Sequence, residues 1–435
     1  MGTLTNLKKA LLTSSQTALI PYDLEAALNE ELIRLQPLLE LMAVETAGGK
    51  THEYSLRTAH PQGWFEGETT PMNQLASTYE RKSVVLKIGR IWGGVTGFAQ
   101  AVDEPFINAL AAELEGSVQG MSDLFEYSIL FGCANDTTLY GGDAYQTTGL
   151  LPWIFANANA TRVYDAGGNK LVLDDMDVLL AEVQQYRQTA RDPYIFFMSQ
   201  RMKQVADGLQ SKVQLPLQTV ELADGKIVMA AYGGAPIFET NYLKPGTTSP
   251  ACTAVKAAGG SLTAGDYKFR ISSVTIYGEC VGGVTSDTVT TETTNLTANL
   301  SWTPDADALL YMIFRQTTSG SYYLIDIIAA KTYDGAGTVN GTVAAYVDNG
   351  AKTPSAYVKP LEAGEEQIVL ANRNPQRGIK FLGRVDDMGR QLNNLVSYIE
   401  LARTKDTYDY MLKSYFALLL KYKNMAGVIR HAKLS

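Results

Sequence analysis

Few side chains in this 435-residue chain have the types and spacing that chemistry requires. Gly49-Lys50-Thr51 matches the end of a phosphate-binding loop, in which backbone N–H groups surround the phosphates of a nucleotide. That motif also needs a glycine at position 44, where this chain has Val44, and a strand and a helix in a fixed order around it. We therefore expect no nucleotide-binding or other cofactor-binding residue.

The histidines offer little for acid–base or nucleophilic catalysis. There are three, His52, His60 and His431, and they fall in a predicted arm and in the tail. A Ser-His-Asp arrangement needs a histidine held by a packed scaffold. Neither H-E-x-x-H nor G-x-S-x-G occurs. The sequence therefore indicates no catalytic residue, and we expect that the protein is not an enzyme.

Two pairs of adjacent carboxylates could attract a cation. Asp174-Asp175 is explained more simply by the start of a helix, where negative charge is favourable. Asp386-Asp387 is predicted to lie in a turn beside Gly389. Hard cations need more converging oxygens than one pair supplies, so no metal site is expected.

Composition excludes further classes. The net charge of −8 is unlike that of a sequence-specific DNA-binding protein, and no apolar run is long enough to span a bilayer. Three cysteines without a C-x-x-C motif fit a reducing compartment, although a Cys252–Cys280 disulfide is conceivable. The length favours two or three domains.

The clearest pattern is an arm followed by a long helix. Two extended runs, Thr51–Thr58 and Tyr79–Phe98, are predicted to leave the body, with Gly93, Gly94 and Gly97 where the chain turns back. A helix of roughly 28 residues, about 40 Å long, is predicted from Asp103 onward. Its apolar stripe is Phe106, Leu110, Leu114, Val118, Met121 and Phe125.

A mixed α/β body is predicted after residue 174. Tyr194–Met198 has the pattern of a buried strand, and Ser199 can cap the helix that follows it. Further strands are expected at 226–231 and 236–239. The apolar run Tyr410–Leu420 indicates a sheet that is covered on both faces.

Residues 248–357 have a different character, because they are rich in threonine and lack helical periodicity. Short β runs separated by turn signals predict a small β-sandwich. Pro245-Gly246 and Pro354-Ser355 bracket this stretch like linkers, so we expect a domain inserted into a loop of the host fold.

The order of these parts resembles the major capsid proteins of tailed bacteriophages with the HK97-type fold. The resemblance rests on the helix after Ala18-Leu19-Ile20-Pro21, the stretch Gly63–Glu68, the strand Tyr79–Gln100, the long helix to Phe131-Gly132, the Thr148–Leu151 turn and the tail Lys413–Arg430. It implies an α+β fold with an extended loop called the E-loop, a spine helix, and peripheral and axial domains.

The resemblance also implies domain boundaries. They are an N-terminal arm (1–20), an N-terminal helix region (21–45), the E-loop (46–100), the peripheral domain with the spine helix (101–149), the axial domain (150–247 and 358–400), the insertion (248–357) and the C-terminal peripheral strands (401–435). The insertion resembles immunoglobulin-like or fibronectin type III domains, through Leu262–Arg270 and Leu300–Pro304.

Six residues of the arm are candidate inter-subunit contacts: Trp64, Phe65, Glu66, Glu68, Arg81 and Lys82. The aromatic pair either packs on its own subunit or anchors in a pocket of a neighbour. An extended arm has little core of its own, which favours the second interpretation.

The function implied by the resemblance is structural. Pentamers and hexamers would form an icosahedral virion shell around double-stranded DNA, assembled in the bacterial host cytoplasm, with the insertion facing outward. The partners implied are other copies of the chain, weakly bound DNA, and possible scaffolding, portal or decoration proteins, with no membrane. The alternatives are the shell of an encapsulin-like nanocompartment and a carbohydrate-binding role for the insertion.

Overall fold

The structure is a computed structural model that describes residues 42–434, except for 64, 66–74, 99–108, 136–139, 186–192, 213–217, 222–227, 317–319, 335–337, 375–377, 385–389, 392–395, 402–405 and 423–424. The predicted N-terminal arm, the helix after Pro21, the start of the spine helix and the pair Asp386-Asp387 lie outside these described residues.

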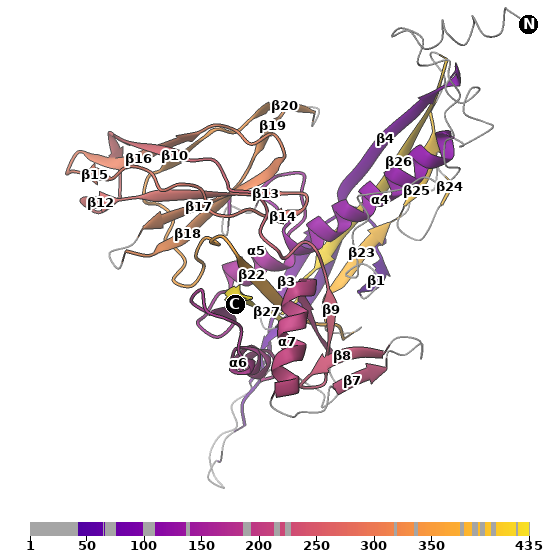
Figure 1. The fold of residues 1–435 in the computed structure, drawn as a ribbon, viewed down its shortest axis with the longest axis horizontal. Coiled ribbons are helices and arrows are strands. Elements are labelled where there is room, and N and C mark those ends of the chain that lie inside the picture. Colours follow the sequence, from indigo (N-terminus) through magenta and orange to yellow (C-terminus); the bar gives the residue numbers. More distant parts are fainter. Residues whose placement is uncertain are drawn as a thin grey trace, which may run out of the picture.

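A mixed seven-stranded sheet forms the centre of the body (Figure 1). In order across the sheet its strands are β5 (Val163–Asp165), β27 (Ala426–Lys433), β22 (Glu365–Asn372), β6 (Tyr194–Met198), β9 (Ala235–Glu239), β8 (Val228–Tyr232) and β7 (Gln218–Glu221). The predicted buried strand is confirmed as β6, whose five residues are all buried. The expected strands at 226–231 and 236–239 correspond to β8 and β9.

Helices cover this sheet on both faces. Helices α6 (Leu173–Gln184) and α7 (Gln200–Lys212) contribute to one core, and α5 (Leu150–Ala156) to the other. Alternate residues of β6 enter the two cores, since side chains alternate along a strand. The predicted cap of α7 is confirmed by the Met202 N–H, which donates to Ser199 Oγ at 3.1 Å.

The carboxylates at the start of α6 act as the sequence predicted. Asp174 and Asp175 lie in its first turn, and an Asp175 oxygen accepts the Val172 N–H at 3.1 Å. This pair therefore stabilises a helix N-terminus, where backbone N–H groups lack partners within the helix.

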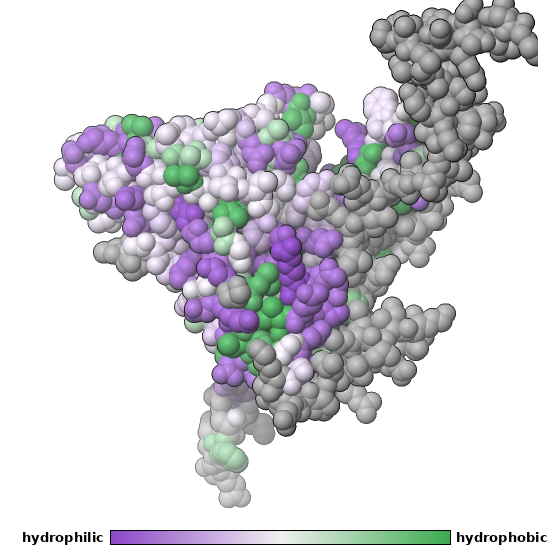
Figure 2. Space-filling model, viewed as in Figure 1, coloured by the Kyte–Doolittle hydropathy of each residue, from purple (hydrophilic) through white to green (hydrophobic). Residues whose placement is uncertain are grey.

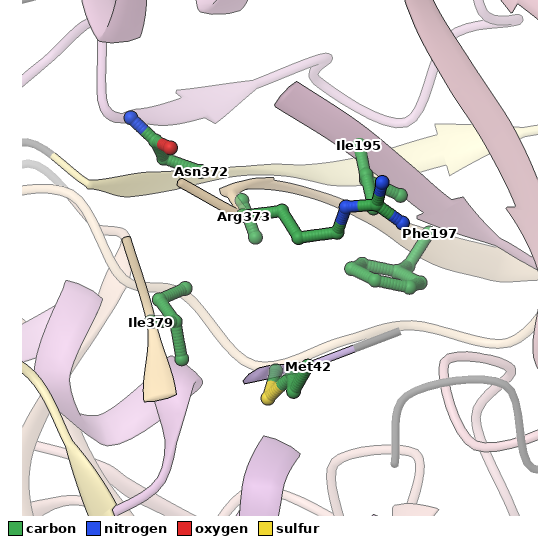
Figure 3. A pocket seen from close by; sticks show the side chains of 7 residues that line it. Met42, Ile195, Phe197, Asn372, Arg373 and Ile379 are labelled. Carbon is green, nitrogen blue, oxygen red and sulfur yellow. The ribbon is translucent and has the colours of Figure 1, made fainter. Parts of the chain in front are cut away.

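Met42 fills part of the junction between the two main sheets. Figure 3 shows its side chain facing Ile379, with Ile195 and Phe197 on the opposite wall. These residues leave a cavity of about 10 Å³, at the lower limit of the space that one water molecule needs. The sheets are therefore closely packed where the described chain begins.

A second, six-stranded sheet runs along an extended limb beside helix α4 (Ala109–Leu130), as Figure 1 shows. Its strands are β1 (Ala43–Thr46), β4 (Lys87–Thr96), β23 (Lys380–Arg384), β24 (Arg390–Gln391), β25 (Ser397–Glu400) and β26 (Thr407–Leu419). Strand β26 is central, with β4 on one side and both β23 and β25 on the other. The apolar tail is therefore an internal strand. The expectation that both of its faces are covered holds only for 416–420, which are buried throughout, because buried and half-buried residues alternate from Tyr410 to Tyr415.

The predicted run Tyr79–Phe98 is not one strand of the arm. It divides at Leu86 into β3 (Thr78–Val85), which pairs with β2 (Thr51–Ala59), and β4, which pairs with β26 of the body. The predicted turn at Gly93 and Gly94 is wrong, because β4 continues through both. A side chain at Gly93 would lie 2.4 Å from the hydroxyl of Tyr410, so this glycine makes room for an aromatic ring on the neighbouring strand.

The apolar stripe of the spine helix is confirmed in part. Met121 and Phe125 are buried against β26 and β23, whereas Val118 is 42% exposed, which corrects its predicted place in the stripe. The described helix leaves the limb surface after its first turns and becomes wholly buried from Phe125 to Leu130.

Residues 252–348 form a β-sandwich. One sheet contains β10 (Cys252–Ala257), β11 (Gly259–Gly260), β16 (Asn295–Trp302) and β21 (Ala345–Asp348), and the other β13 (Phe269–Thr275), β14 (Gly278–Glu279), β17 (Ala308–Gln316) and β18 (Tyr322–Ala329). Two small ladders complete it: β12 (Gly265–Tyr267) with β15 (Val289–Thr291), and β19 (Lys331–Tyr333) with β20 (Val339–Thr342). Trp302 lies in its core against Tyr311.

The sandwich is not suspended on linkers. In β17, Tyr311 and Ile313 enter the sandwich core, while Leu310, Met312 and Phe314 enter the core of the host body. The flanking segments also bond to it: Gly246 N–H donates to Glu279 O at 3.0 Å and Ser355 N–H to Leu324 O at 2.7 Å. The predicted linkers are therefore part of the packed structure.

Candidate inter-subunit surface

The β2–β3 hairpin has almost no core of its own. Most of its residues are exposed, because a two-stranded ribbon can bury one face only against something else. The exposed stretch continues through residues 60–63 and 75–76. An isolated hairpin of this kind is marginally stable in water, so a surface that covers it would stabilise it.

Phe65 is fully exposed in the single chain, with 107% of its reference area accessible. Among the described residues Phe65 packs against nothing, which does not favour the interpretation that it packs on its own subunit. Trp64, Glu66 and Glu68, which the sequence places beside it, lie outside the described residues.

The two basic candidates lie on β3 and make ion pairs within the hairpin. Arg81 Nε is 3.3 Å from a Glu53 oxygen, and Lys82 Nζ is 3.5 Å from a Glu80 oxygen. All four side chains are at least one-third exposed. Ion pairs this exposed contribute little to stability, typically about 0–1 kcal/mol, so they can exchange partners at low cost.

The base of the hairpin is anchored to the body. A small core of Ala47, Leu86, Leu382, Ala417 and Leu419 lies under it, with Tyr54, Val84 and Tyr415 packed against it. The Tyr54 hydroxyl donates to Leu420 O at 3.3 Å. The hairpin therefore leaves the body in a defined direction while its far end stays open.

Trp92 on β4 is a second exposed aromatic residue, and sequence reasoning missed it. Gly89 and Ile91 face α4, so Ile88 and Trp92 point from the opposite face of the sheet, where they are 58% and 74% exposed. The available signal was the two-residue period of the strand, which places Trp92 opposite the helix-facing residues. The sequence pattern alone places this stretch in the arm.

Tyr410 holds the limb rigid behind that face. Its hydroxyl lies 2.7 Å from Ser117 Oγ and donates to Glu113 O at 2.8 Å, which joins β26 to α4. Phe125, Phe381 and Phe416 form a cluster of rings, with centroids 5.1 to 5.5 Å apart, farther along the same interface. The exposed residues of β4 therefore belong to a stiff surface.

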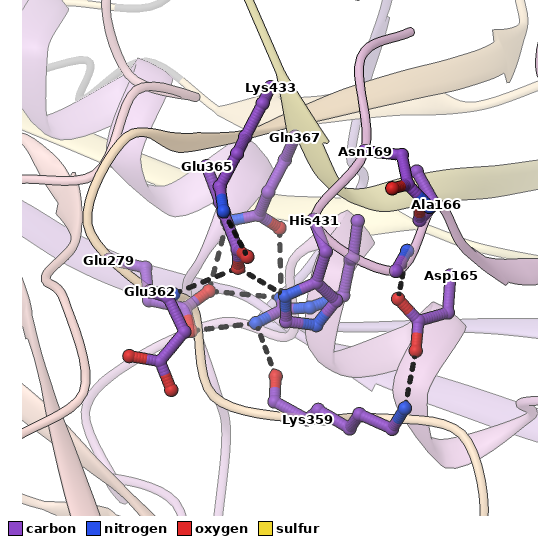
Figure 4. A network of polar contacts seen from close by, with 12 residues as sticks. Asp165, Ala166, Asn169, Glu279, Lys359, Glu362, Glu365, Gln367, His431 and Lys433 are labelled. Atoms are coloured by element: carbon purple, nitrogen blue, oxygen red, sulfur yellow. Dashed lines mark hydrogen bonds and ion pairs between the residues drawn. The ribbon is translucent and has the colours of Figure 1, made fainter. Parts of the chain in front are cut away.

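A buried polar cluster attaches the sandwich to the body (Figure 4). The Arg430 guanidinium donates to both oxygens of Glu279, at 2.8 and 3.0 Å, and to the Gln367 side chain at 2.9 Å and Lys359 O at 3.0 Å. Gln367 donates in turn to Glu279 at 2.9 Å. Arg430 has no exposed surface, so its charge depends on these partners.

A β-bulge explains how Arg430 reaches this position. Glu366 pairs with Ala432 and Ile368 with Ile429, so Arg430 and His431 together oppose Gln367. His431 adopts a φ of 59°, a left-handed conformation that is unusual for a residue other than glycine. Its Nδ1 lies 2.5 Å from a Glu365 oxygen, and Lys433 Nζ lies 3.7 Å from the other.

On the face drawn in Figure 2, the sandwich and the body differ in hydropathy. In Figure 2 the sandwich is mostly pale or purple, and the largest green area lies where Figure 1 places α6 and α7. Val172, next to α6, is 46% exposed. This end of the body is therefore a further candidate for contact with another copy.

The described residues contain no group of three or more His, Cys, Asp or Glu side chains placed to hold a metal ion. In the same part of the chain, no helix combines the length and apolar character that crossing a membrane requires. Cys133, Cys252 and Cys280 are buried free thiols, so the conceivable Cys252–Cys280 disulfide is not formed.

Comparison with known proteins gives these surfaces a context. Residues 22–233 match the model of the SU10 major capsid protein family. The chain has the fold of a phage major capsid protein. No curated protein matches it in sequence.

Two solved structures share this capsid fold over nearly the whole chain. The capsid of cyanophage A-1(L) is 12% identical, with 96% of this chain and 98% of that chain covered and a TM-score of 0.51. The SrpI encapsulin of Synechococcus elongatus is 10% identical, with 96% and 94% covered and a TM-score of 0.51. At these identities the likeness establishes the HK97-type fold, and the family match supports a bacteriophage major capsid protein.

Proposed function

We propose that this protein assembles as pentamers and hexamers into an icosahedral capsid around double-stranded phage DNA. The observation that carries the proposal is the β2–β3 hairpin, which is anchored at its base, lacks a core and has Phe65 fully exposed. A surface of this kind is costly for a monomer and useful for a subunit that overlaps its neighbours.

In this proposal the hairpin of one copy covers a neighbour. Trp64 and Phe65 anchor the contact, and Glu66, Glu68, Arg81 and Lys82 form ion pairs around the aromatic residues. Interfaces of standard size bury about 800 Å² on each partner. Several such contacts per subunit make the lattice stable by multivalency even where each is weak.

The proposed division of the chain changes the predicted regions at three places. Residues 101–149 and 380–419 form the peripheral domain, since β23, β24, β25 and β26 share the limb sheet. Residues 150–247, 358–372 and 426–433 form the axial domain, since β22 and β27 lie in the body sheet. The extended loop proper is the β2–β3 hairpin, since β4 pairs with β26 of the body. The sandwich is an immunoglobulin-like domain on the outer surface of the shell, which its hydrophilic face in Figure 2 favours.

The protein has a structural role and no catalytic one in this account. Its place is the virion, with assembly in the bacterial cytoplasm. The tail from residue 401 has seven Lys or Arg against two Asp; Arg430 is buried, and the other six give weak and salt-sensitive contact with packaged DNA. Separate scaffolding, portal or decoration proteins are compatible with the fold.

An encapsulin-like compartment is the second candidate, because the SrpI encapsulin and the cyanophage capsid have equal TM-scores of 0.51 to this chain. The two functions differ in the content of the shell. Nuclease-protected double-stranded DNA in particles purified from the native source supports a virus, and a protein cargo without DNA supports a compartment.

Electron microscopy and light scattering of the expressed protein test assembly. We expect closed shells from the native chain, and folded, soluble subunits without stable shells after deletion of residues 60–75 or after Phe65→Ser. Val255→Ser, on the sandwich and 65% exposed, is the matched control and should assemble. Normal shells from both hairpin variants would reject the proposed role of the hairpin, and monomers from the native chain would reject assembly.

A further inference from the structure

We propose that the cleft between the sandwich and α5 is a binding site for a neutral, hydroxyl-rich small molecule, of the size of a disaccharide. The cleft has a volume of about 450 Å³, within the range of small-molecule pockets. Its walls come from α5, from strand β18 and from the segment 351–357 that returns from the sandwich to the body. Capsid assembly requires nothing of this cavity.

Tyr140 is the first reason to expect a ligand. Only 8% of it is exposed, and it lines the cleft. Its hydroxyl is not among the buried polar atoms left without a partner, so solvent reaches this oxygen at the cleft and a bound molecule could take the place of that solvent. Burial raises the pKa of Tyr140, so the hydroxyl stays protonated and is available as a donor. An oxygen atom of a ligand in the cleft would accept a hydrogen bond from this hydroxyl.

Lys352 is the one charged residue among the described residues that line the cleft, and it is paired with the buried Asp326. Lys352 Nζ donates to Asp326 Oδ1 at 2.6 Å, and the same oxygen accepts the N–H groups of Gly141 at 2.8 Å and Ile327 at 2.9 Å. An ammonium group has three donors, so Lys352 retains two beyond this pair. Because Asp326 already neutralises it, an anionic ligand would find no excess positive charge here.

The remaining exposed groups are polar and uncharged. Thr353 and Ser355 contribute hydroxyls, and Tyr357 is 37% exposed at the rim. The large apolar residues of the wall, Phe155, Leu324 and Ile325, are at most 4% exposed. An apolar ligand would therefore bury little surface, whereas a sugar would find several hydrogen-bonding groups around a closed floor.

The site is tested on the full-length protein with free maltose, cellobiose and lactose as neutral probes, and with glucuronate and inorganic phosphate as charged ones. Saturation-transfer NMR and calorimetry measure binding. We expect at least one neutral disaccharide to bind and the charged probes not to compete. Tyr140→Phe keeps the ring and removes one hydrogen bond, so it should weaken binding about threefold to tenfold.

Ala356→Trp, at an exposed position of the lining, should block the cleft and abolish binding. Val255→Trp, on the outer face of the other sheet of the sandwich, is the matched control and should bind as the native chain does. The proposal is overturned if no neutral disaccharide binds, if phosphate binds in preference, or if binding survives Ala356→Trp. Particle formation, recorded in the same samples, separates these outcomes from a failure of assembly.

Discussion

Arg430 and Glu279 form a fully buried, two-pronged ion pair between the last strand of the body and the edge of the sandwich, with N–O distances of 2.8 and 3.0 Å. Each residue has almost no exposed surface. Such a pair joins two parts of a structure in one geometry, because either charge alone would be left buried without compensation.

Removal of one partner of this pair should be strongly destabilising. We expect Arg430→Met to lower the free energy of unfolding by about 3–5 kcal/mol, because Glu279 then stays buried and unpaired. The double variant Arg430→Met with Glu279→Leu should recover part of the loss. Denaturant unfolding of each variant measures this, and a single variant as stable as the native chain would contradict it.

The close contact between Gly93 and Tyr410 can be tested by comparing the same glycine-to-alanine substitution at Gly93 and at Gly116. Gly93→Ala should destabilise the limb, since its Cβ would lie 2.4 Å from the Tyr410 hydroxyl. Gly116→Ala is the control, because nothing lies within 4 Å of that Cβ in α4, and it should stabilise by about 0.5–1 kcal/mol. Thermal unfolding compares the two, and equal effects would argue against the close contact.

The carboxyl groups around His431 predict a loss of stability in acid. Burial alone would raise the pKa of Glu365, but hydrogen bonds from His431 and the Glu362 N–H, with the charges of His431 and Lys433, lower it overall. The pKa of Asp165 is also lowered: burial opposes the change, and the bonds from Lys359 and the Gly167 N–H outweigh it. Both groups therefore favour the folded state when they are ionised.

The lowered pKa values of Glu365 and Asp165 determine how the stability of the fold changes with pH. The stabilisation is complete above the unfolded pKa values, about 4, and is lost as the pH falls through the lower folded values. Denaturant midpoints measured from pH 6 to pH 3 should fall at the acid end, and Glu365→Gln should flatten the fall. Glu115→Gln, at an exposed position of α4, is the control and should leave the profile unchanged.

Trp92 should matter for assembly and not for folding. It is 74% exposed on a rigid sheet, so Trp92→Ser removes little from the core of the single chain. We expect a melting temperature within a few degrees of the native value and a marked loss of shells, because aromatic residues contribute strongly to interfaces. Val255→Ser, exposed on the sandwich, should assemble normally, and full assembly of the Trp92 variant would exclude that face from the lattice contacts.

Local patterns predicted the elements well and their partners poorly. Tyr194–Met198, Ser199 and the Asp174-Asp175 pair were assigned correctly because each depends on neighbours in sequence. The division of Tyr79–Phe98 depends on β26, more than 300 residues away, and no local pattern marks it. That distant pairing causes the break at Leu86: the residues before it join the hairpin as β3, and the residues after it join the body as β4.

The attachment of the sandwich was missed for a similar reason. The run Leu310–Phe314 is apolar throughout, which is typical of a strand buried on both faces. Only the structure shows that its two faces belong to different cores. Of the candidate contacts, the sequence found the exposed Phe65 because it stands on a polar arm, and missed Trp92 because the register of β4 was unknown.

A strand with one face in each core constrains how this gene can change. Recombination that replaced residues 252–348 by an unrelated module would remove Leu310, Met312 and Phe314 from beneath the body and leave a hole there. The sandwich and the body must therefore be inherited together, while the turns of the sandwich that lie far from its contact with the body are free to diverge. Those distal turns are the places where a foreign peptide could be grafted for display.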